Sequence, residues 1–147
     1  FVIIDPAGMR SQRMQWAASL SDMWIIPQKA TSLDAAATAN LLEVDMEAIV
    51  GMRGGRSIPH RILFTMTNPL IMSKNERHVV NATRNKAPVF DTELRQYDAY
   101  AAMDLYGLTL EEVEEQGVAN AQKPRAYAAE ILRQAIEDIK AAEVERK

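Results

Sequence analysis

Cysteine is absent from the 147 residues of this sequence, and histidine occurs only twice, as His60 and His78. The lack of cysteine excludes a disulfide framework and metal sites built on thiolates. Neither histidine has a partner at the spacing that metal ligands need, so we do not expect a zinc site. No apolar run approaches the roughly 18 residues of a membrane span, and no secretory leader is recognisable. We therefore expect a cytoplasmic protein that does not enter a membrane.

A phosphate-binding P-loop is also missing. This loop has the pattern GxxxxGK[ST] between a strand and a helix, where backbone N–H groups and a helix N-terminus hold phosphates. The nearest stretch is GMRGGRS at residues 51–57, which is one residue short and has arginine in place of the lysine. It follows a helical pattern and precedes Pro59 and a strand pattern. We interpret it as a loop that ends a helix.

What is present fits an ordinary globular domain. Apolar residues make up 48% of the sequence and charged residues 25%, so a disordered or low-complexity chain is not expected. A chain of this length can bury a core of its own. Without internal repeats or a linker, we expect residues 1–147 to form a single domain.

The net charge of −3 hides an uneven distribution. Residues 53–86 contain seven lysines and arginines against one acid, Glu76, whereas residues 91–147 contain thirteen acids against seven bases. A basic stretch of this kind can face a polyanion such as nucleic acid. The alternative is a solvated surface that the acidic part of the chain balances.

Strand and helix patterns alternate along the chain. Strands are predicted over residues 1–4, 23–26, 61–67 and 88–94. Helices are predicted over residues 9–19, 35–50, 73–85, 96–106 and 110–116, and over the C-terminal part of the chain. The run at 1–4 is continuously apolar and rich in β-branched residues, which is typical of a strand covered on both faces. This alternation predicts an α/β fold, a parallel sheet with helices on both faces.

The first predicted strand runs directly into Asp5, and a PAG turn follows. Ligands bind outside the carboxyl ends of the strands in parallel α/β folds, so Asp5 is expected at the binding edge. A carboxylate there can hold Mg²⁺ through water, and Gly8 lets a backbone N–H approach a terminal phosphate. The alternative is that Asp5 only caps the next helix. A response-regulator-like domain, in which Asp5 accepts a phosphoryl group, needs further acids from an earlier strand end, and none is visible.

Taken together, the blocks of this sequence resemble one family. They are FVIIDPAG, DMWIIPQKATSLD, RILFTMTN, PVFDTELR and AYAAMDLYGLTL, in this order and followed by a closing helix. The pattern is similar to the C-terminal two-thirds of a ParA/MinD-type partition ATPase of the plasmid-partition and VirC-like branch. The resemblance implies a P-loop NTPase-like fold that is partial here, because the N-terminal P-loop strand, the KGGxGKT loop and its signature lysine are absent. We therefore expect an upstream segment that carries them, and without it the edge of the strand at 1–4 lacks a partner.

The resemblance also implies roles for single residues. Asp5 matches the catalytic Walker B aspartate that orders Mg²⁺, and Gly8 matches the switch II glycine that meets the γ-phosphate. Asp34, together with Ser32, matches a loop near the dimer and nucleotide interface. The residues that match the adenine pocket and the block closing over the base are Thr67, Asn68, Leu94 and Arg95. The alternatives are that Asp34 caps a helix, and that Thr67 and Asn68 only end a strand.

Two functions remain open from the sequence. The resemblance implies an ATPase switch in DNA partitioning, in which ATP and Mg²⁺ join two subunits and a ParB-like partner activates hydrolysis. The homodimer then binds DNA nonspecifically through basic side chains such as Arg77, Arg84 and Lys86. The alternative is a non-catalytic fragment that acts as a binding or assembly module. We expect hydrolysis from the full-length protein and not from this segment, because the phosphate-binding loop is missing.

The aromatic residues of the acidic half are predicted to pack against other side chains rather than to form a ligand site. They include Tyr97, Tyr100 and Tyr106. Large aromatic side chains in helices contribute to cores more often than to ligand sites. No binding role is assigned to them from the sequence.

Overall fold

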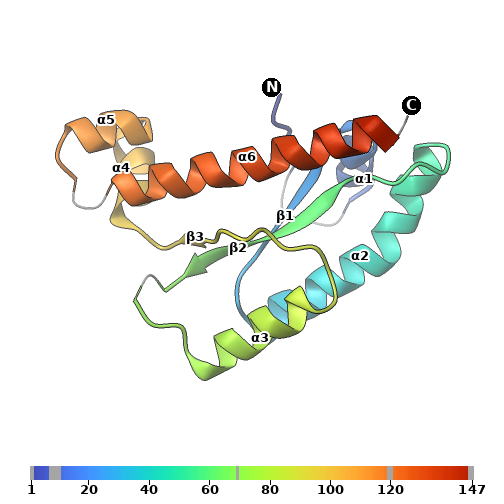
Figure 1. Cartoon of the computed structure of the whole chain (residues 1–147), viewed down its shortest axis with the longest axis horizontal. Helices are drawn as coiled ribbons and strands as arrows, with labels where there is room; N and C mark the ends of the chain where they lie inside the picture. The colour runs from blue at the N-terminus through green and yellow to red at the C-terminus, as the bar shows by residue number, and fades with distance from the viewer. Residues whose placement is uncertain (1, 7–10, 69, 119–120, 146–147) are drawn as a thin grey trace.

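The computed structural model of the chain is an α/β structure in which a three-stranded parallel sheet lies between helices (Figure 1). The structure describes residues 2–6, 11–68, 70–118 and 121–145. The strands follow the order β1-β2-β3 and are β1 (Trp24–Gln28), β2 (His60–Thr67) and β3 (Leu94–Arg95). The helices are α1 (Gln12–Leu20), α2 (Ser32–Met52), α3 (Lys74–Arg84), α4 (Asp98–Tyr106), α5 (Leu110–Glu115) and α6 (Gln122–Glu145). None of these helices combines the length and apolar character needed to cross a membrane.

Helices cover both faces of the sheet, as predicted. In Figure 1, α6 crosses one face while α2 and α3 lie along the other. Side chains alternate across β2: Ile62 and Phe64 pack under α2 and α3, whereas Leu63 packs against Ile131 and Ala135 of α6. The period of two in a strand explains this alternation. The buried apolar run of β2 therefore supplies both halves of the core.

The predicted helix boundaries agree well with the structure because the capping residues are local signals. Ser73 begins α3 by accepting a hydrogen bond from the backbone N–H of Glu76 at 3.2 Å. The Glu76 carboxylate accepts in return from the Ser73 N–H at 2.7 Å, which completes a capping box. Thr31 caps α2 in a similar way, and Gly54 and Gly55 with positive φ follow its end.

The predicted strand at residues 1–4 is wrong over the residues that the structure describes. Residues 2–6 have no regular structure, and Val2 and Ile3 are 90% and 91% exposed. A strand needs a neighbour whose backbone N–H and C=O groups it can pair with. Within the described residues β1 pairs only with β2, so its other edge carries no strand.

Two other strands differ from their predicted bounds. The strand predicted to end at residue 26 is longer, because β1 continues through Pro27 to Gln28. Proline is tolerated there since β1 has a neighbour on only one side within the described part of the chain. The predicted strand at 88–94 is assigned strand pairing with β2 only in part: a single bridge joins Val89 to Ile62, and regular pairing is limited to Leu94–Arg95.

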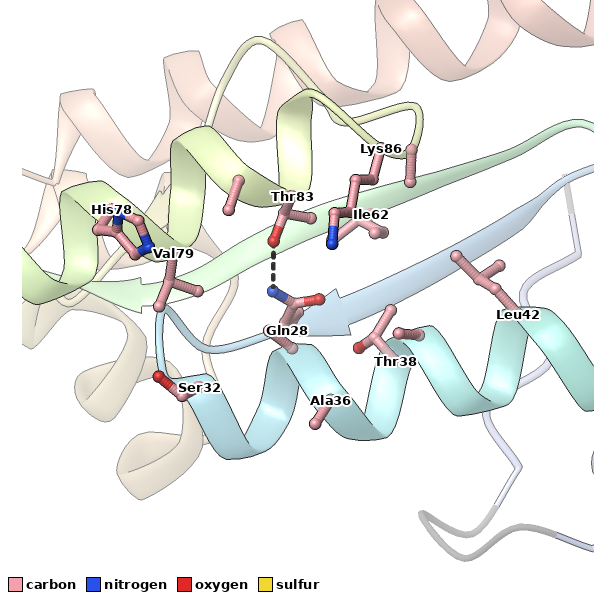
Figure 2. A pocket seen from close by; sticks show the side chains of 14 residues that line it. Gln28, Ser32, Ala36, Thr38, Leu42, Ile62, His78, Val79, Thr83 and Lys86 are labelled. Carbon is pink, nitrogen blue, oxygen red and sulfur yellow. Dashed lines mark hydrogen bonds between the residues drawn. The ribbon is translucent and has the colours of Figure 1, made fainter.

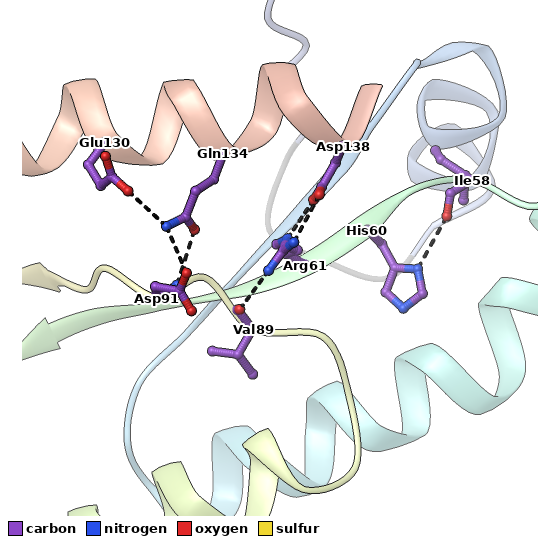
Figure 3. A network of polar contacts seen from close by, with 8 residues as sticks. All are labelled: Ile58, His60, Arg61, Val89, Asp91, Glu130, Gln134 and Asp138. Carbon is purple, nitrogen blue, oxygen red and sulfur yellow. Dashed lines mark hydrogen bonds and ion pairs between the residues drawn. The ribbon is translucent and has the colours of Figure 1, made fainter. Parts of the chain in front are cut away.

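An ion pair fastens α6 to the middle of the sheet (Figure 3). Arg61 of β2 donates from Nη2 to Oδ1 of Asp138 at 2.9 Å and from Nη1 to the carbonyl oxygen of Val89 at 3.1 Å. One turn earlier on α6, Gln134 donates to Asp91 Oδ2 at 3.1 Å, and its Oε1 accepts from the Asp91 N–H at 3.1 Å. These contacts position α6 over β2 and the segment leading to β3.

We predict that Asp138→Ala destabilises the chain by about 2 kcal/mol, because the half-buried Arg61 loses a two-pronged charged hydrogen bond. Urea unfolding followed by circular dichroism measures this change. The control is Glu137→Ala, which breaks an exposed pair with Arg133 on the same helix and is expected to have a much smaller effect. Equal effects of the two substitutions would contradict the role given to Arg61.

Candidate functional site

A cavity of about 380 Å³ opens where β2 and β3 end. Its walls come from the end of β2, from β3 and from the first turn of α4: Thr65, Met66, Leu94, Arg95, Gln96, Tyr97, Asp98, Tyr100 and Ala101. The carboxyl ends of parallel strands are the usual ligand edge of an α/β sheet. The cavity is therefore the first candidate for a functional site.

The end of β2 is irregular beside this cavity. The pairing register with β3 shifts between Thr65, opposite Leu94, and Thr67, opposite Arg95. Met66 between them has φ of +55°, in the left-handed region that side-chain-bearing residues rarely adopt. Bulges and positive-φ residues cost free energy and concentrate at ligand sites. Here the irregularity turns Met66 outward, where it is 55% exposed and lines the cavity.

Two buried hydroxyl groups at this edge have no hydrogen-bond partner among the residues that the structure describes. They are Oγ1 of Thr67, a residue only 2% exposed, and Oη of Tyr100. A buried polar atom without a partner costs about 1 to 3 kcal/mol. Such atoms are rare in native proteins unless a ligand, ion or water satisfies them. Both hydroxyls can donate to or accept from a bound molecule.

Aromatic rings and a guanidinium group form the far wall. Tyr97 stacks on Tyr127 at 6.2 Å between ring centroids and lies 6.4 Å from Tyr100 in a tilted arrangement. Cζ of Arg95 lies 5.7 Å from the Tyr127 centroid. Burial raises the pKa of Tyr97 and of Tyr100, and the neighbouring phenols act in the same direction. Both phenols are therefore protonated at neutral pH and can donate a hydrogen bond to a ligand.

Three of the residues matched to the adenine pocket and its lid lie together. Thr67 is opposite Arg95 in the β2–β3 ladder, and Leu94 lines the cavity beside Arg95. Asn68 is different, because its Oδ1 accepts hydrogen bonds from the backbone N–H groups of Leu70 and Ile71 at 2.9 and 3.2 Å. Its side chain thus folds into a local turn, as the alternative of a strand-ending residue predicts.

Asp34 lies in the first turn of α2, after the end of β1. The Oδ2 atom of Asp34 accepts a hydrogen bond from Thr31 Oγ1 at 2.6 Å. The backbone N–H of Asp34 donates to that Thr31 Oγ1 at 3.1 Å. This is the geometry of a helix cap, and a carboxylate in the first turn also interacts favourably with the helix dipole. A role of Asp34 at a dimer or nucleotide interface stays a prediction.

Asp5 does not lie at the end of a strand. It is exposed and belongs to the irregular segment 2–6. Gly8 lies outside the described residues. Within the part of the chain that the structure describes, no three histidine or acidic side chains gather as a metal site, so Asp5 is a single carboxylate that could hold Mg²⁺ only with help from water or phosphate.

The basic stretch divides into structural and exposed side chains. Arg53 is buried and donates to the carbonyl oxygens of Ser19 and Ser21, and Arg61 binds Asp138. The three predicted DNA-binding residues lie on α3 and just after it, and all are exposed: Arg77, Arg84 and Lys86. Arg84 makes only a long contact of 3.9 Å with Glu93.

The sequence interpretation missed the contribution of Tyr97 and Tyr100, which were assigned to packing. The structure places both in the cavity wall, whereas Tyr106 is 65% exposed. Their position in the sequence could have indicated this role, because Tyr97 and Tyr100 follow the last residue of β3 by two and five positions. Residues just after a strand end lie at the ligand edge of the sheet. The strained backbone of Met66 has no signal in the sequence.

Comparison with known proteins gives one relationship and one negative result. No family model matches the chain. The chain is similar to a protein of Rhizobium radiobacter named Protein ParA, with 27% identity over 143 residues. The alignment covers 95% of this chain and 64% of the relative, so the chain spans less than two thirds of the relative's length. This similarity supports a ParA-like relationship.

The tyrosine wall predicts a pH dependence of stability. A phenol whose pKa is raised above its ordinary value of 10.0 stabilises the fold fully below that pH, and the contribution is lost as pH rises through the folded-state pKa. We expect Tyr100→Phe to flatten the fall in unfolding free energy between about pH 9 and pH 11. Urea unfolding at both pH values measures it. The exposed Tyr106→Phe is the control, and an equal flattening in both variants would refute the prediction.

Proposed function

We propose that this chain is the base-binding part of a ParA-like ATPase that acts as a nucleotide switch in DNA partitioning. The observation that carries the proposal is the cavity where β2 and β3 end, with its tyrosine wall and the unpartnered hydroxyl of Tyr100. The similarity to Protein ParA adds support over 95% of the chain. The switch requires an additional phosphate-binding segment, because the chain has no P-loop pattern.

The cavity has the chemistry that an adenine base needs. Aromatic and guanidinium groups offer flat surfaces for stacking, here Arg95 and the ring of Tyr97. The Tyr100 hydroxyl can pair with a ring nitrogen or with the exocyclic amine, and pairing would remove the cost of its burial. A base held here leaves the ribose and phosphates outside the sheet edge, toward the loops that follow the strands.

Mg²⁺ would reach this protein together with the phosphates. Asp5 is the carboxylate proposed to hold it through water, and Gly8 the residue proposed to meet the γ-phosphate. The exposed position of Asp5 leaves room for a hydrated ion. When bound, the ion would neutralise phosphate charge during hydrolysis.

Partners and location follow from the same proposal. ATP binding would favour a homodimer, and the dimer would bind DNA without sequence preference through Arg77, Arg84 and Lys86. A ParB-like protein would stimulate hydrolysis, and the protein would work in the cytoplasm. The plasmid-partition and VirC-like branch is the branch proposed.

A second candidate function is a non-catalytic binding or assembly module. Its support is the exposed apolar segment Val2, Ile3 and Ile4 together with the absence of a P-loop pattern from these residues. An assay of ATP hydrolysis by the purified chain with Mg-ATP distinguishes the two functions for this chain. Hydrolysis by the chain alone would contradict the module, and its absence would favour it for the chain as it stands.

We predict that the chain binds ATP and adenosine through the cavity at the end of β2 and β3. Titration followed by ¹H–¹⁵N NMR should shift the amide signals of Thr67, Leu94 and Tyr100. Arg95→Ala should weaken binding about tenfold, because a stacking cation is removed. Arg133→Ala on the outer side of α6 is the control and should leave affinity unchanged. Binding of ATP without shifts at these residues would overturn the site.

DNA binding through α3 has a separate test. Affinity of the chain for a short duplex, measured by fluorescence anisotropy at several salt concentrations, should fall as salt rises. Arg77→Ala and Arg84→Ala should each reduce the slope of log affinity against log salt by about 1. Arg133→Ala is the control again. A slope that neither substitution changes would show that these side chains do not contact phosphates.

A further inference from the structure

A second cavity, of about 470 Å³, lies between α2 and α3 on the face of the sheet opposite α6 (Figure 2). It does not belong to the site described above, because no residue is shared between the two walls. Small side chains create the space. Five alanines contribute to the wall. Ala35, Ala36 and Ala39 belong to α2, Ala82 belongs to α3, and Ala87 lies in the segment after α3. Larger side chains at these positions would fill the gap between the helices.

A buried amide group at the end of β1 forms the floor of this cavity. Gln28 is 2% exposed, and its Nε2 donates to Thr83 Oγ1 at 3.4 Å. Its Oε1 is buried and has no hydrogen-bond partner. Figure 2 shows the amide between α2 and α3, with Oε1 directed away from Thr83. Burying an unpartnered carbonyl oxygen costs free energy that a bound N–H or O–H donor would recover.

A cation lies at the same end of the cavity. Figure 2 shows the Lys86 side chain extending from the end of α3 into the pocket, with its ammonium on the side of Gln28 Oε1. No ion pair joins Lys86 to a carboxylate among the described residues. The long stem of lysine lets the ammonium move to meet a ligand. Gln28, whose Oε1 lacks a donor, and Lys86, which lacks a carboxylate partner among the described residues, therefore line the same cavity.

The remaining walls are mostly apolar. Leu42, Ile62 and Val79 surround the space beyond Gln28 and Lys86 together with the alanines. An apolar group bound there would be removed from water, which favours binding. A phosphate or a nucleotide fits poorly, because its several negative charges would meet one lysine, His78 and the hydroxyls of Ser32, Thr38 and Thr83 among mostly apolar walls.

We propose that this cavity binds a small carboxylate that has an O–H or N–H group on the α carbon and an apolar side chain. The α-substituent donates to Gln28 Oε1, the carboxylate accepts from the Lys86 ammonium, and the side chain occupies the alanine-lined space. Gln28 and Lys86 both line this cavity, so a ligand with a donor and a carboxylate on one carbon can meet both. This site shares no residue with the proposed nucleotide cavity, although Lys86 also belongs to the proposed DNA-binding surface. Its ligand class includes 2-hydroxy acids and N-acylated amino acids.

The test titrates the chain with mandelate, α-methoxyphenylacetate and benzyl alcohol, followed by ¹H–¹⁵N NMR. Mandelate should give saturable shifts at Gln28, including its side-chain amide, and at Thr83. α-Methoxyphenylacetate lacks the O–H donor and should bind about tenfold more weakly than mandelate. Benzyl alcohol lacks the carboxylate, and its affinity should also be about tenfold below that of mandelate. Lys86→Gln should weaken mandelate about tenfold, with the exposed Lys74→Gln as the matched control.

Several results would overturn the proposal. They are equal binding of the three compounds, shifts confined to other parts of the chain, or no saturable binding of mandelate. Ala82→Leu adds a variant that fills the cavity and should abolish binding. Its circular dichroism spectrum shows whether it folds, and a folded Ala82→Leu that binds mandelate like the unchanged chain would also refute the site. If Ala82→Leu does not fold, the Lys86→Gln and Lys74→Gln pair decides.

Discussion

The pairing of β2 on both sides is the constraint on which the rest of this structure depends. β2 is the strand that hydrogen-bonds both neighbours, and its alternating side chains build the core on both faces. A parallel strand in this position must be apolar on both faces, which explains the run Ile62–Leu63–Phe64. Helices α2 and α3 on one side and α6 on the other are then required to remove those side chains from water.

The same strand sets the position of the candidate site. Regular pairing of β2 ends between Thr65 and Thr67, where Met66 adopts a positive φ and the register with β3 shifts. Buried polar groups without partners lie near this point, in contrast to the well-satisfied contacts around Arg61 in the earlier part of β2. Order at one end of β2 and irregularity at the other agree with a rigid scaffold that presents a site at its edge.

Much of the fold could be predicted from the sequence, because local signals determine it. Caps such as Ser73 with Glu76, and the continuous apolar pattern of β2, located α3 and β2 within one or two residues. The segment at residues 1–4 could not be predicted in the same way, because an apolar run becomes a strand only where a neighbour offers hydrogen bonds. Of the residues that resemblance assigned to the adenine pocket and its lid, Leu94 and Arg95 line the cavity and Thr67 lies opposite Arg95, while their binding role stays a prediction. The role of Arg61 depends on a contact with Asp138, 77 positions away, and no local pattern encodes it.

The bond between Arg61 and Asp138 has a consequence for how the chain is made. Its partners are 77 positions apart, and Asp138 belongs to the last helix. Until α6 has left the ribosome, Leu63 and Phe90 lack their cover, and one face of the nascent sheet is open to water. A sheet closed so late folds slowly, because distant segments must meet before the core is complete. During synthesis the half-built sheet is therefore the species most exposed to aggregation and to capture by chaperones.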